Sequence, residues 1–148
     1  RRLLERGCAR LTGVDFSPKT LARARENLAP WPNLELVEAD AQELQYRSAF
    51  DIAYSVLTFL HIPDKPRALA AMVSALRPGG RLVLSVAHEG EWLECNGRKL
   101  ALHVAPPEAY RDWLRELGCA VRPPVDRLAP DGTRMATIVW AQMRTQET

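Results

Sequence analysis

Residues 50–87 read FDIAYSVLTFLHIPDKPRALAAMVSALRPGGRLVLSVA, and this stretch decides the fold class. Residues 50–57 form a near-continuous apolar run, which is typical of a strand covered on both faces. A helix is predicted over residues 66–76, because its apolar side chains recur with helical spacing. The Arg-Pro-Gly-Gly segment at 77–80 ends this helix, and residues 81–87 form a second apolar strand. The strand–helix–strand order predicts a parallel α/β unit.

The same order occurs once before this stretch. Short strands are predicted over residues 9–15 and 34–37. Ser17 and Pro18 start the helix between them, since serine is a preferred N-cap residue and proline suits the first helical turn. Residues 1–6 have the pattern of a helix end.

The pattern changes after residue 87. Asn96-Gly97 is the strongest short-range hairpin signal, and it predicts a β-hairpin insertion over residues 91–104. The remaining predicted elements are a helix that begins at residue 107 and strands over residues 119–128 and 135–143. The last two strands are close in sequence and should be antiparallel. We therefore predict one domain over residues 1–148, with a doubly wound Rossmann-like α/β fold, a mostly parallel sheet and an antiparallel C-terminal strand.

Composition excludes several classes of protein. The 148 residues include 20 Lys and Arg against 18 Asp and Glu, which gives a formal net charge of +2. This balance excludes nucleic-acid binding by bulk electrostatics, and no apolar run reaches the ~18 residues that a membrane span needs. We expect neither nucleic acid nor a membrane as a partner. The length suits a single hydrophobic core.

The cysteines indicate neither a disulfide framework nor a metal site. Cys8, Cys95 and Cys119 are an odd number, lie far apart and form no CxxC pair. We expect buried free thiols, a reducing cytoplasmic location and no bound metal.

Two acidic residues mark a candidate nucleotide site, because ligands of open α/β sheets bind beyond the carboxyl ends of the strands. Asp15 ends the first predicted strand, and its carboxylate is suited to accept hydrogen bonds from ribose hydroxyls. Phe16 beside it could stack on a purine. Asp40 follows the next strand and is an acceptor for an adenine amino group. The alternatives are that Asp15 only favours the adjacent helix N-terminus, by about 0.3–1 kcal/mol, and that Asp40 only forms a turn.

Four segments resemble, in order and spacing, the successive motifs of class I S-adenosylmethionine-dependent methyltransferases: residues 13–18 (GVDFSP), 38–41 (EADA), 50–55 (FDIAYS) and 76–84 (LRPGGRLVL). The resemblance covers nearly the whole chain and implies S-adenosylmethionine as cofactor. It implies that Asp15 holds the cofactor ribose, that Phe16 flanks the adenine, and that Asp40 with the Ala41 backbone reads the adenine edge. It also implies that Ser55 lies near the methionyl portion.

One departure from the family pattern concerns the first motif. The family's defining strand and glycine-rich turn have no counterpart in residues 1–7. We therefore expect that the chain is N-terminally incomplete, and that the absent strand belongs between the strands that end at Asp15 and Ser55. Those two strands would then face a gap ~4.8 Å wider than the pairing distance. The DNA ahead of the Arg1 codon tests this expectation.

Catalytic residues are sparse in such a reaction. Methyl transfer is an in-line displacement, to which a protein contributes mainly alignment, and a base is needed only when the acceptor carries a proton that must leave. His61 and His88 each lie just past a predicted strand end and are the candidates for that base. The alternative for each is a local structural role. Residues 56–62, which include His61, resemble the loop-helix that covers the cofactor in small-molecule members of the family.

The leading hypothesis is an S-adenosylmethionine-dependent methyltransferase that acts on a small-molecule acceptor, because the hairpin is too small to serve as a macromolecular recognition module. Whether the hairpin is a lid or a contact in a homodimer stays open. A second hypothesis is a degenerate methyltransferase-like domain that serves as a non-catalytic binding or assembly module, which the absent glycine turn favours. A third is a nicotinamide-dependent oxidoreductase, which the antiparallel final strands do not suit.

Overall fold

The computed structural model describes residues 1–87 and 90–145, apart from the side chain of Cys95. The chain divides into two compact units, Arg1–Leu44 and Gln45–Thr148, called here the first and second unit. The prediction of a single domain stays a prediction.

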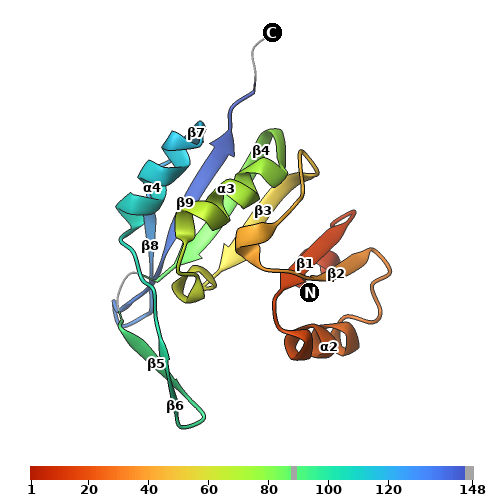
Figure 1. Cartoon of the computed structure of the whole chain (residues 1–148), viewed down its shortest axis with the longest axis horizontal. Coiled ribbons are helices and arrows are strands. Elements are labelled where there is room, and N and C mark those ends of the chain that lie inside the picture. The colour runs from red at the N-terminus through yellow and green to blue at the C-terminus, as the bar shows by residue number, and fades with distance from the viewer. Residues whose placement is uncertain (88–89, 146–148) are drawn as a thin grey trace. The chain divides into compact units, whose positions relative to one another are not determined.

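The first unit is a parallel βαβ unit preceded by a short helix (Figure 1). Its elements are α1 (Arg2–Glu5), β1 (Leu11–Asp15), α2 (Pro18–Asn27), β2 (Leu34–Glu38) and the 3-10 helix η1 (Ala41–Glu43). The predicted start of α2 is confirmed: the Ser17 hydroxyl accepts a hydrogen bond from the Thr20 N–H at 3.3 Å, and Pro18 is the first helical residue. Leu21 is the buried residue of α2.

The two strands of the first unit pack closely at Gly13. A Cβ atom built on Gly13 would lie 2.8 Å from Cδ2 of Leu36 on β2, which is closer than carbon atoms approach. A side chain at position 13 would therefore displace Leu36. The glycine preserves the parallel register, which runs from Leu11 opposite Leu34 to Asp15 opposite Glu38.

The second unit contains a five-stranded sheet, two helices and a hairpin (Figure 1). Its elements are β3 (Phe50–Val56), the 3-10 helix η2 (Phe59–His61), α3 (Lys65–Ala75), β4 (Leu76–Val86), β5 (Trp92–Cys95), β6 (Arg98–Ala101), α4 (Pro107–Glu116), β7 (Cys119–Val121), β8 (Val125–Leu128) and β9 (Arg134–Met143). The strand order is β3-β4-β9-β7, and β8 also pairs with β9. β3 and β4 are parallel, whereas β9 is antiparallel to β4.

These pairings confirm the Rossmann-like α/β class, with parallel pairs and an antiparallel C-terminal strand. The predicted hairpin is also confirmed: β5 and β6 are joined by Asn96 and Gly97, both with positive φ, which is the geometry of a type I′ turn. Its strands are shorter than the 91–104 range that the sequence suggested.

Two boundary predictions are wrong. Residues 77–80 belong to β4 rather than to a separate break: the register passes from Phe50 opposite Leu76 to Ile52 opposite Arg81, so the intervening residues bulge out of the ladder. The single strand expected over residues 119–128 is two strands, β7 and β8, because Pro123 and Pro124 between them have no N–H to donate to a ladder.

The prediction that the strand over residues 50–57 is covered on both faces is also wrong. Ile52, Tyr54 and Val56 are 57%, 48% and 62% exposed, and they alternate along β3 on one face. The physical reason is that α3 and α4 lie together on the opposite face of this sheet (Figure 1). Among the described strands, β3 pairs only with β4, and β1 pairs only with β2.

The core of the second unit lies between the β4–β9 ladder and the two helices. The contributing side chains are at most 5% exposed; they are Leu69 and Val73 of α3, Leu82, Leu84 and Val86 of β4, Tyr110 and Leu114 of α4, and Val139 and Ala141 of β9. Tyr110 makes an edge-to-face contact with Phe59, at 5.7 Å between ring centroids. No described residue hydrogen-bonds to the Tyr110 hydroxyl, and burial raises the pKa of this group.

Lys65, the first residue of α3, is 3% exposed, although buried ammonium groups are rare. Its Nζ donates a hydrogen bond of 2.7 Å to the Ile62 carbonyl at the end of η2. Burial lowers the pKa of Lys65 because it removes water from the charged form. The position at a helix N-terminus disfavours a cation further.

We predict that Leu84→Ala lowers the free energy of unfolding of the second unit by about 2–5 kcal/mol, because it leaves a cavity in a close-packed core. Leu128→Ala is the matched control: Leu128 is 57% exposed on β8, and its truncation should change stability by about 0.5 kcal/mol or less. Urea unfolding followed by circular dichroism measures both values. Equal effects of the two substitutions would contradict the assignment of the core.

A second prediction concerns pH. The charged form of Lys65 lowers the free energy of unfolding, because burial lowers its pKa. This destabilisation is present in full below the lowered pKa, and it disappears as pH rises from there toward the ordinary pKa of lysine. The stability of the wild-type chain relative to Lys65→Met should therefore increase as pH rises through that window. Unfolding at several pH values measures the difference. The exposed Lys19, changed to Met, is the control and should show no such trend.

Candidate functional site

The two predicted nucleotide-binding acids lie at the same edge of the first unit. Asp15 is the last residue of β1 and pairs in register with Glu38, the last residue of β2. The Ala39 N–H donates a hydrogen bond of 3.2 Å to the Asp15 carbonyl, so Asp40 is the residue next to this bond. Parallel pairing thus brings together two acids that are 25 positions apart in the sequence, as their positions at strand ends predicted.

One oxygen of the Asp15 carboxylate accepts a hydrogen bond within the first unit, and the other is available to a ligand. It is half-buried, and its Oδ1 accepts a hydrogen bond of 2.8 Å from the Ser17 N–H. No described residue hydrogen-bonds to Oδ2. The carboxylate thus contacts the N-cap residue of α2, and this contact occupies one oxygen only. Phe16 is 75% exposed directly after this carboxylate and offers an uncovered aromatic ring.

Asp40 is exposed and caps η1. Its Oδ1 accepts a hydrogen bond of 2.8 Å from the Gln42 N–H, and the Gln42 side-chain amide lies 3.2 and 3.1 Å from the two carboxylate oxygens. Gln42 therefore orients Asp40, a contribution that the sequence analysis missed. The signal was present, since an Asp side chain commonly accepts a hydrogen bond from the backbone N–H two residues later. Ala41, the first residue of η1, is half-buried.

The remaining predicted cofactor residue belongs to the second unit. Ser55 is half-buried near the carboxyl end of β3 and pairs in register with Leu84. Its expected role at the methionyl portion stays a prediction. Leu57, just beyond, has φ +52°, and its N–H donates to the Ser85 carbonyl at 2.8 Å. A bulky residue in the left-handed region is a genuine outlier, and nothing in the sequence indicates it.

His61 is exposed on η2, which is firmly held from several sides. The His103 N–H donates to the Leu60 carbonyl at 2.7 Å, Lys65 binds the Ile62 carbonyl, and Phe59 is buried against Tyr110. The His61 imidazole is thus presented to solvent from a rigid turn. The second candidate base, His88, lies outside the described residues.

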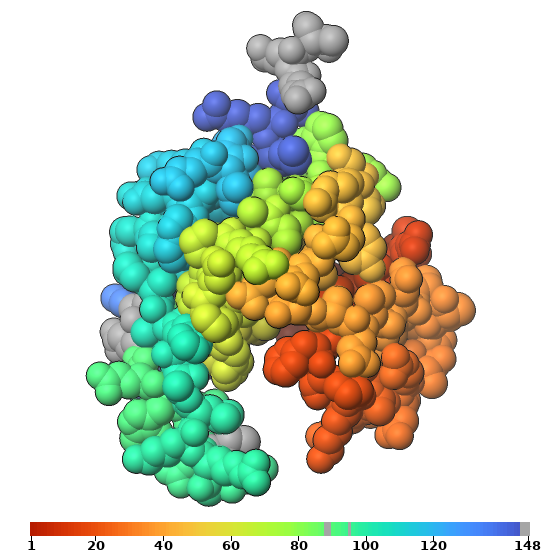
Figure 2. Space-filling view, viewed as in Figure 1, coloured from red at the N-terminus to blue at the C-terminus, as the bar shows by residue number. Residues whose placement is uncertain are grey.

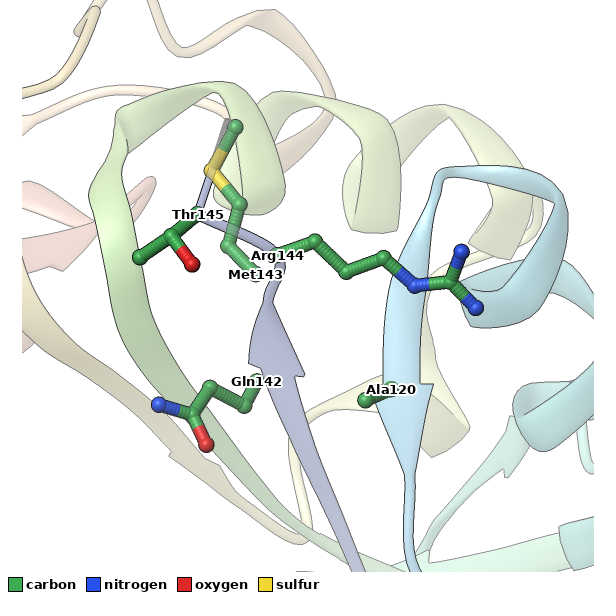
Figure 3. A pocket seen from close by; sticks show the side chains of 5 residues that line it. All are labelled: Ala120, Gln142, Met143, Arg144 and Thr145. Atoms are coloured by element: carbon green, nitrogen blue, oxygen red, sulfur yellow. The ribbon is translucent and has the colours of Figure 1, made fainter. Parts of the chain in front are cut away.

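An open hollow at the end of β9 is a poor substrate site. It is lined by Ala120, Gln142, Met143, Arg144 and Thr145. The side chains of Gln142 and Arg144 point away from one another, so their polar groups do not converge (Figure 3). Gln142 pairs with Arg81, where the regular pairing of β4 begins. The hollow therefore lies at the amino ends of β3 and β4, away from the carboxyl ends where a ligand is expected.

Other site types have no support in the described parts of the chain. Over residues 1–87 and 90–145, no three His, Cys, Asp or Glu residues gather closely enough to hold a metal ion. None of the helices in those ranges has the length and apolarity to cross a membrane. Cys8 is half-buried and Cys119 is buried, both as free thiols, and burial raises the pKa of Cys119, which makes its thiolate scarcer.

Comparison with known proteins places the chain in a family. Residues 1–84 match the family model described as "Methyltransferase domain". The trans-aconitate 2-methyltransferase of Escherichia fergusonii is 34% identical over 126 residues, which cover 76% of this chain and 48% of that protein. The trans-aconitate 2-methyltransferase of Shigella flexneri matches with the same identity and coverage. The chain thus spans about half the length of the curated relatives it matches.

Solved structures share the fold. An S-adenosylmethionine-dependent methyltransferase from Mesorhizobium loti superposes with a TM-score of 0.81 at 23% identity, over 96% of this chain and 84% of that one. The Burkholderia thailandensis 1,6-didemethyltoxoflavin-N1-methyltransferase, solved with bound 1,6-didemethyltoxoflavin and S-adenosylhomocysteine, gives a TM-score of 0.72 at 23% identity, over 97% of this chain and 64% of that one. Family model, relatives and fold agree: this chain belongs to the class I S-adenosylmethionine-dependent methyltransferase family, whose cofactor is S-adenosylmethionine.

Proposed function

We propose that this chain binds S-adenosylmethionine through its first unit and, in the whole protein, serves methyl transfer to a small-molecule acceptor. The observation that carries the proposal is the meeting of Asp15 and Asp40 at adjacent carboxyl ends of the β1–β2 pair. Ligands of α/β sheets bind at such ends. Family membership supplies the reaction class.

The residues of the first unit fit the adenosine portion of the cofactor. The Oδ2 atom of Asp15 is available to a ribose hydroxyl, while the bond from Ser17 keeps the carboxylate oriented. The exposed ring of Phe16 offers a face to the adenine. We assign Asp40, which Gln42 orients, to the adenine amino group, and the Ala41 N–H to the adenine ring.

Bound S-adenosylmethionine would supply an electrophilic methyl group on a sulfonium, which is a good leaving group. The protein's own contribution is then to align the acceptor and to exclude water. We assign Ser55 to the methionyl portion and His61 to proton removal from acceptors whose reacting atom carries a proton. His88 is the second candidate for that role.

The acceptor to test first is trans-aconitate, because the curated relatives are named for it. The short β5–β6 hairpin, with strands of four residues each, supports a small acceptor, since it is too small to form a recognition module for a macromolecule. We also propose that the whole protein forms a homodimer.

We predict that Asp15→Ala and Asp40→Ala each weaken S-adenosylmethionine binding by about 10- to 100-fold, as expected for the loss of hydrogen bonds to a charged group. Isothermal titration calorimetry measures the affinity. Asp131→Ala is the matched control: its Oδ1 accepts the Thr133 N–H at 2.9 Å, so it makes the same local bond but lies in the β8–β9 turn.

The outcomes separate the competing functions. Unchanged affinity in both variants would overturn the assignment of the two acids. Absent or only millimolar binding by the wild-type chain would overturn the proposal for this chain and favour a non-catalytic binding or assembly module.

A further prediction concerns the base. With an acceptor that carries a proton on the reacting atom, His61→Asn should lower kcat by about 10²–10⁴-fold, because proton removal by a positioned side chain contributes that much. Affinity for S-adenosylhomocysteine should not change. His103→Asn is the control, since His103 is also exposed but contributes only its backbone N–H to the contact with Leu60. Equal kcat values for the two variants would exclude His61 as the base.

A further inference from the structure

The proposed function leaves the buried ammonium group of Lys65 unexplained. Lys65 is only 3% exposed, so it contributes almost nothing to the surface of α3, which Figure 2 shows in yellow-green. Among the described residues its Nζ has one partner, the Ile62 carbonyl at 2.7 Å, and no carboxylate. One neutral carbonyl offsets the loss of water around a charge only in part. Stability therefore does not account for a lysine at this position, which an apolar side chain would fill with less desolvation.

The Ile62 carbonyl, however, needs a donor that the nearby backbone does not supply. Ile62 is 7% exposed and follows the last residue of η2. In an α-helical turn its carbonyl would accept a hydrogen bond from the N–H four positions later, but that residue is Pro66, which has no N–H. A buried carbonyl without a donor is disfavoured. The ammonium of Lys65 thus takes the place of a backbone donor.

The other end of η2 is also held in a conformation that its sequence does not favour. Leu57 has φ +52°, and its N–H donates to the Ser85 carbonyl of β4 at 2.8 Å. The next side chain, Thr58, donates from Oγ1 to the Val56 carbonyl at 3.3 Å. Strained residues of this kind persist only where their surroundings impose them, and they concentrate at functional sites. The chain thus enters η2 through a strained residue and leaves it beside a buried charge.

His61 lies between these two ends. η2 is a single 3-10 turn, closed by bonds from the His61 N–H to the Thr58 carbonyl at 2.9 Å and from the Ile62 N–H to the Phe59 carbonyl at 3.1 Å. A turn this short is not stable by itself, because few hydrogen bonds offset the ordering of the chain. Its position therefore depends on anchors outside it. A displacement of about 1 Å in a catalytic site costs about 10²-fold in rate, so an anchor of η2 affects catalysis if His61 is the base.

We propose that Lys65 is a positioning residue for methyl transfer: its ammonium holds the Ile62 carbonyl, thereby fixes η2, and so sets the position of the His61 imidazole relative to the acceptor. The inference rests on the proposed function, because it takes His61 as the base. Lys65 is buried and acts through η2 rather than by contact with the acceptor.

Hydrogen–deuterium exchange of the whole protein tests the anchoring step without any reaction. Lys65→Met removes the donor, so the His61 and Ile62 amides should exchange at least about tenfold faster. Lys65→Arg keeps N–H donors on a long side chain and should restore slow exchange. Lys99→Met is the matched control, since Lys99 is exposed on the hairpin, with its Nζ 4.4 Å from the centroid of the Trp92 ring. Unchanged exchange in Lys65→Met would overturn the proposal.

Steady-state kinetics of the whole protein test the consequence for catalysis, with a small amine or phenol as acceptor, because its reacting atom carries a proton. Lys65→Met should lower kcat by about 10- to 100-fold and leave the KM for S-adenosylmethionine unchanged, and Lys65→Arg should recover part of the loss. The double variant of Lys65→Met with His61→Asn should be no slower than His61→Asn alone, since a misplaced base and an absent base are the same defect. Circular dichroism must show that each variant is folded.

The outcomes separate this inference from the proposed function. If His61→Asn leaves kcat unchanged, the assignment of the base fails, and the positioning role of Lys65 fails with it. If His61→Asn lowers kcat and Lys65→Met does not, only the positioning role is overturned, because a lysine that serves stability alone leaves the kcat of the folded protein unchanged. Losses that add in the double variant would overturn it as well, since Lys65 would then not act through His61.

Discussion

The backbone ladder of β4 is the constraint on which the second unit depends. β4 pairs in parallel with β3 on one side and antiparallel with β9 on the other, and it is the strand through which the two are joined. Leu82, Leu84 and Val86 alternate along it and are at most 1% exposed beneath α3 and α4. Burial of this apolar face stabilises the sheet, at roughly 25 cal/mol per Å² of apolar surface removed from water.

The segments with a candidate role in catalysis attach to the carboxyl end of this ladder. The last bond of the β3–β4 side joins the Leu57 N–H to Ser85, and η2 follows at once. His103, at the far end of the hairpin region, is bonded to Leu60 of η2. The turn that presents His61 is therefore held by the sheet on one side and by the segment that follows the hairpin on the other. Such preorganisation is what alignment of an acceptor requires.

The first unit shows how one group can serve both stability and binding. Asp15 supports the start of α2 through one oxygen and keeps the other without a partner among the described residues. Asp40 caps η1 through the Gln42 N–H, and the Gln42 side-chain amide lies within hydrogen-bond distance of both of its carboxylate oxygens. The structural and functional interpretations of a strand-end acid are thus compatible, because a carboxylate has more acceptor sites than one backbone N–H can fill.

The sequence by itself determined the features that depend on neighbours within a few residues. The Ser17 cap with Pro18, the Asn96-Gly97 turn and the order of strands and helices were all predictable, because capping and turn geometry are set by local hydrogen bonds and by the φ that a residue tolerates. The meeting of Asp15 and Asp40 was also predictable, since parallel strands end at one edge.

Only the tertiary structure decided which of the apolar residues are covered. A near-continuous apolar run predicted that β3 is covered on both faces, yet Ile52, Tyr54 and Val56 are exposed. Lys65 is buried although its charge predicts exposure, and Leu57 adopts a left-handed conformation. The Leu57 N–H is held by Ser85 of β4, far away in the chain, whereas the Lys65 ammonium is bonded to the nearby Ile62 carbonyl. Hydropathy and local propensity describe what a residue prefers, whereas burial and backbone strain depend on which distant element packs against it.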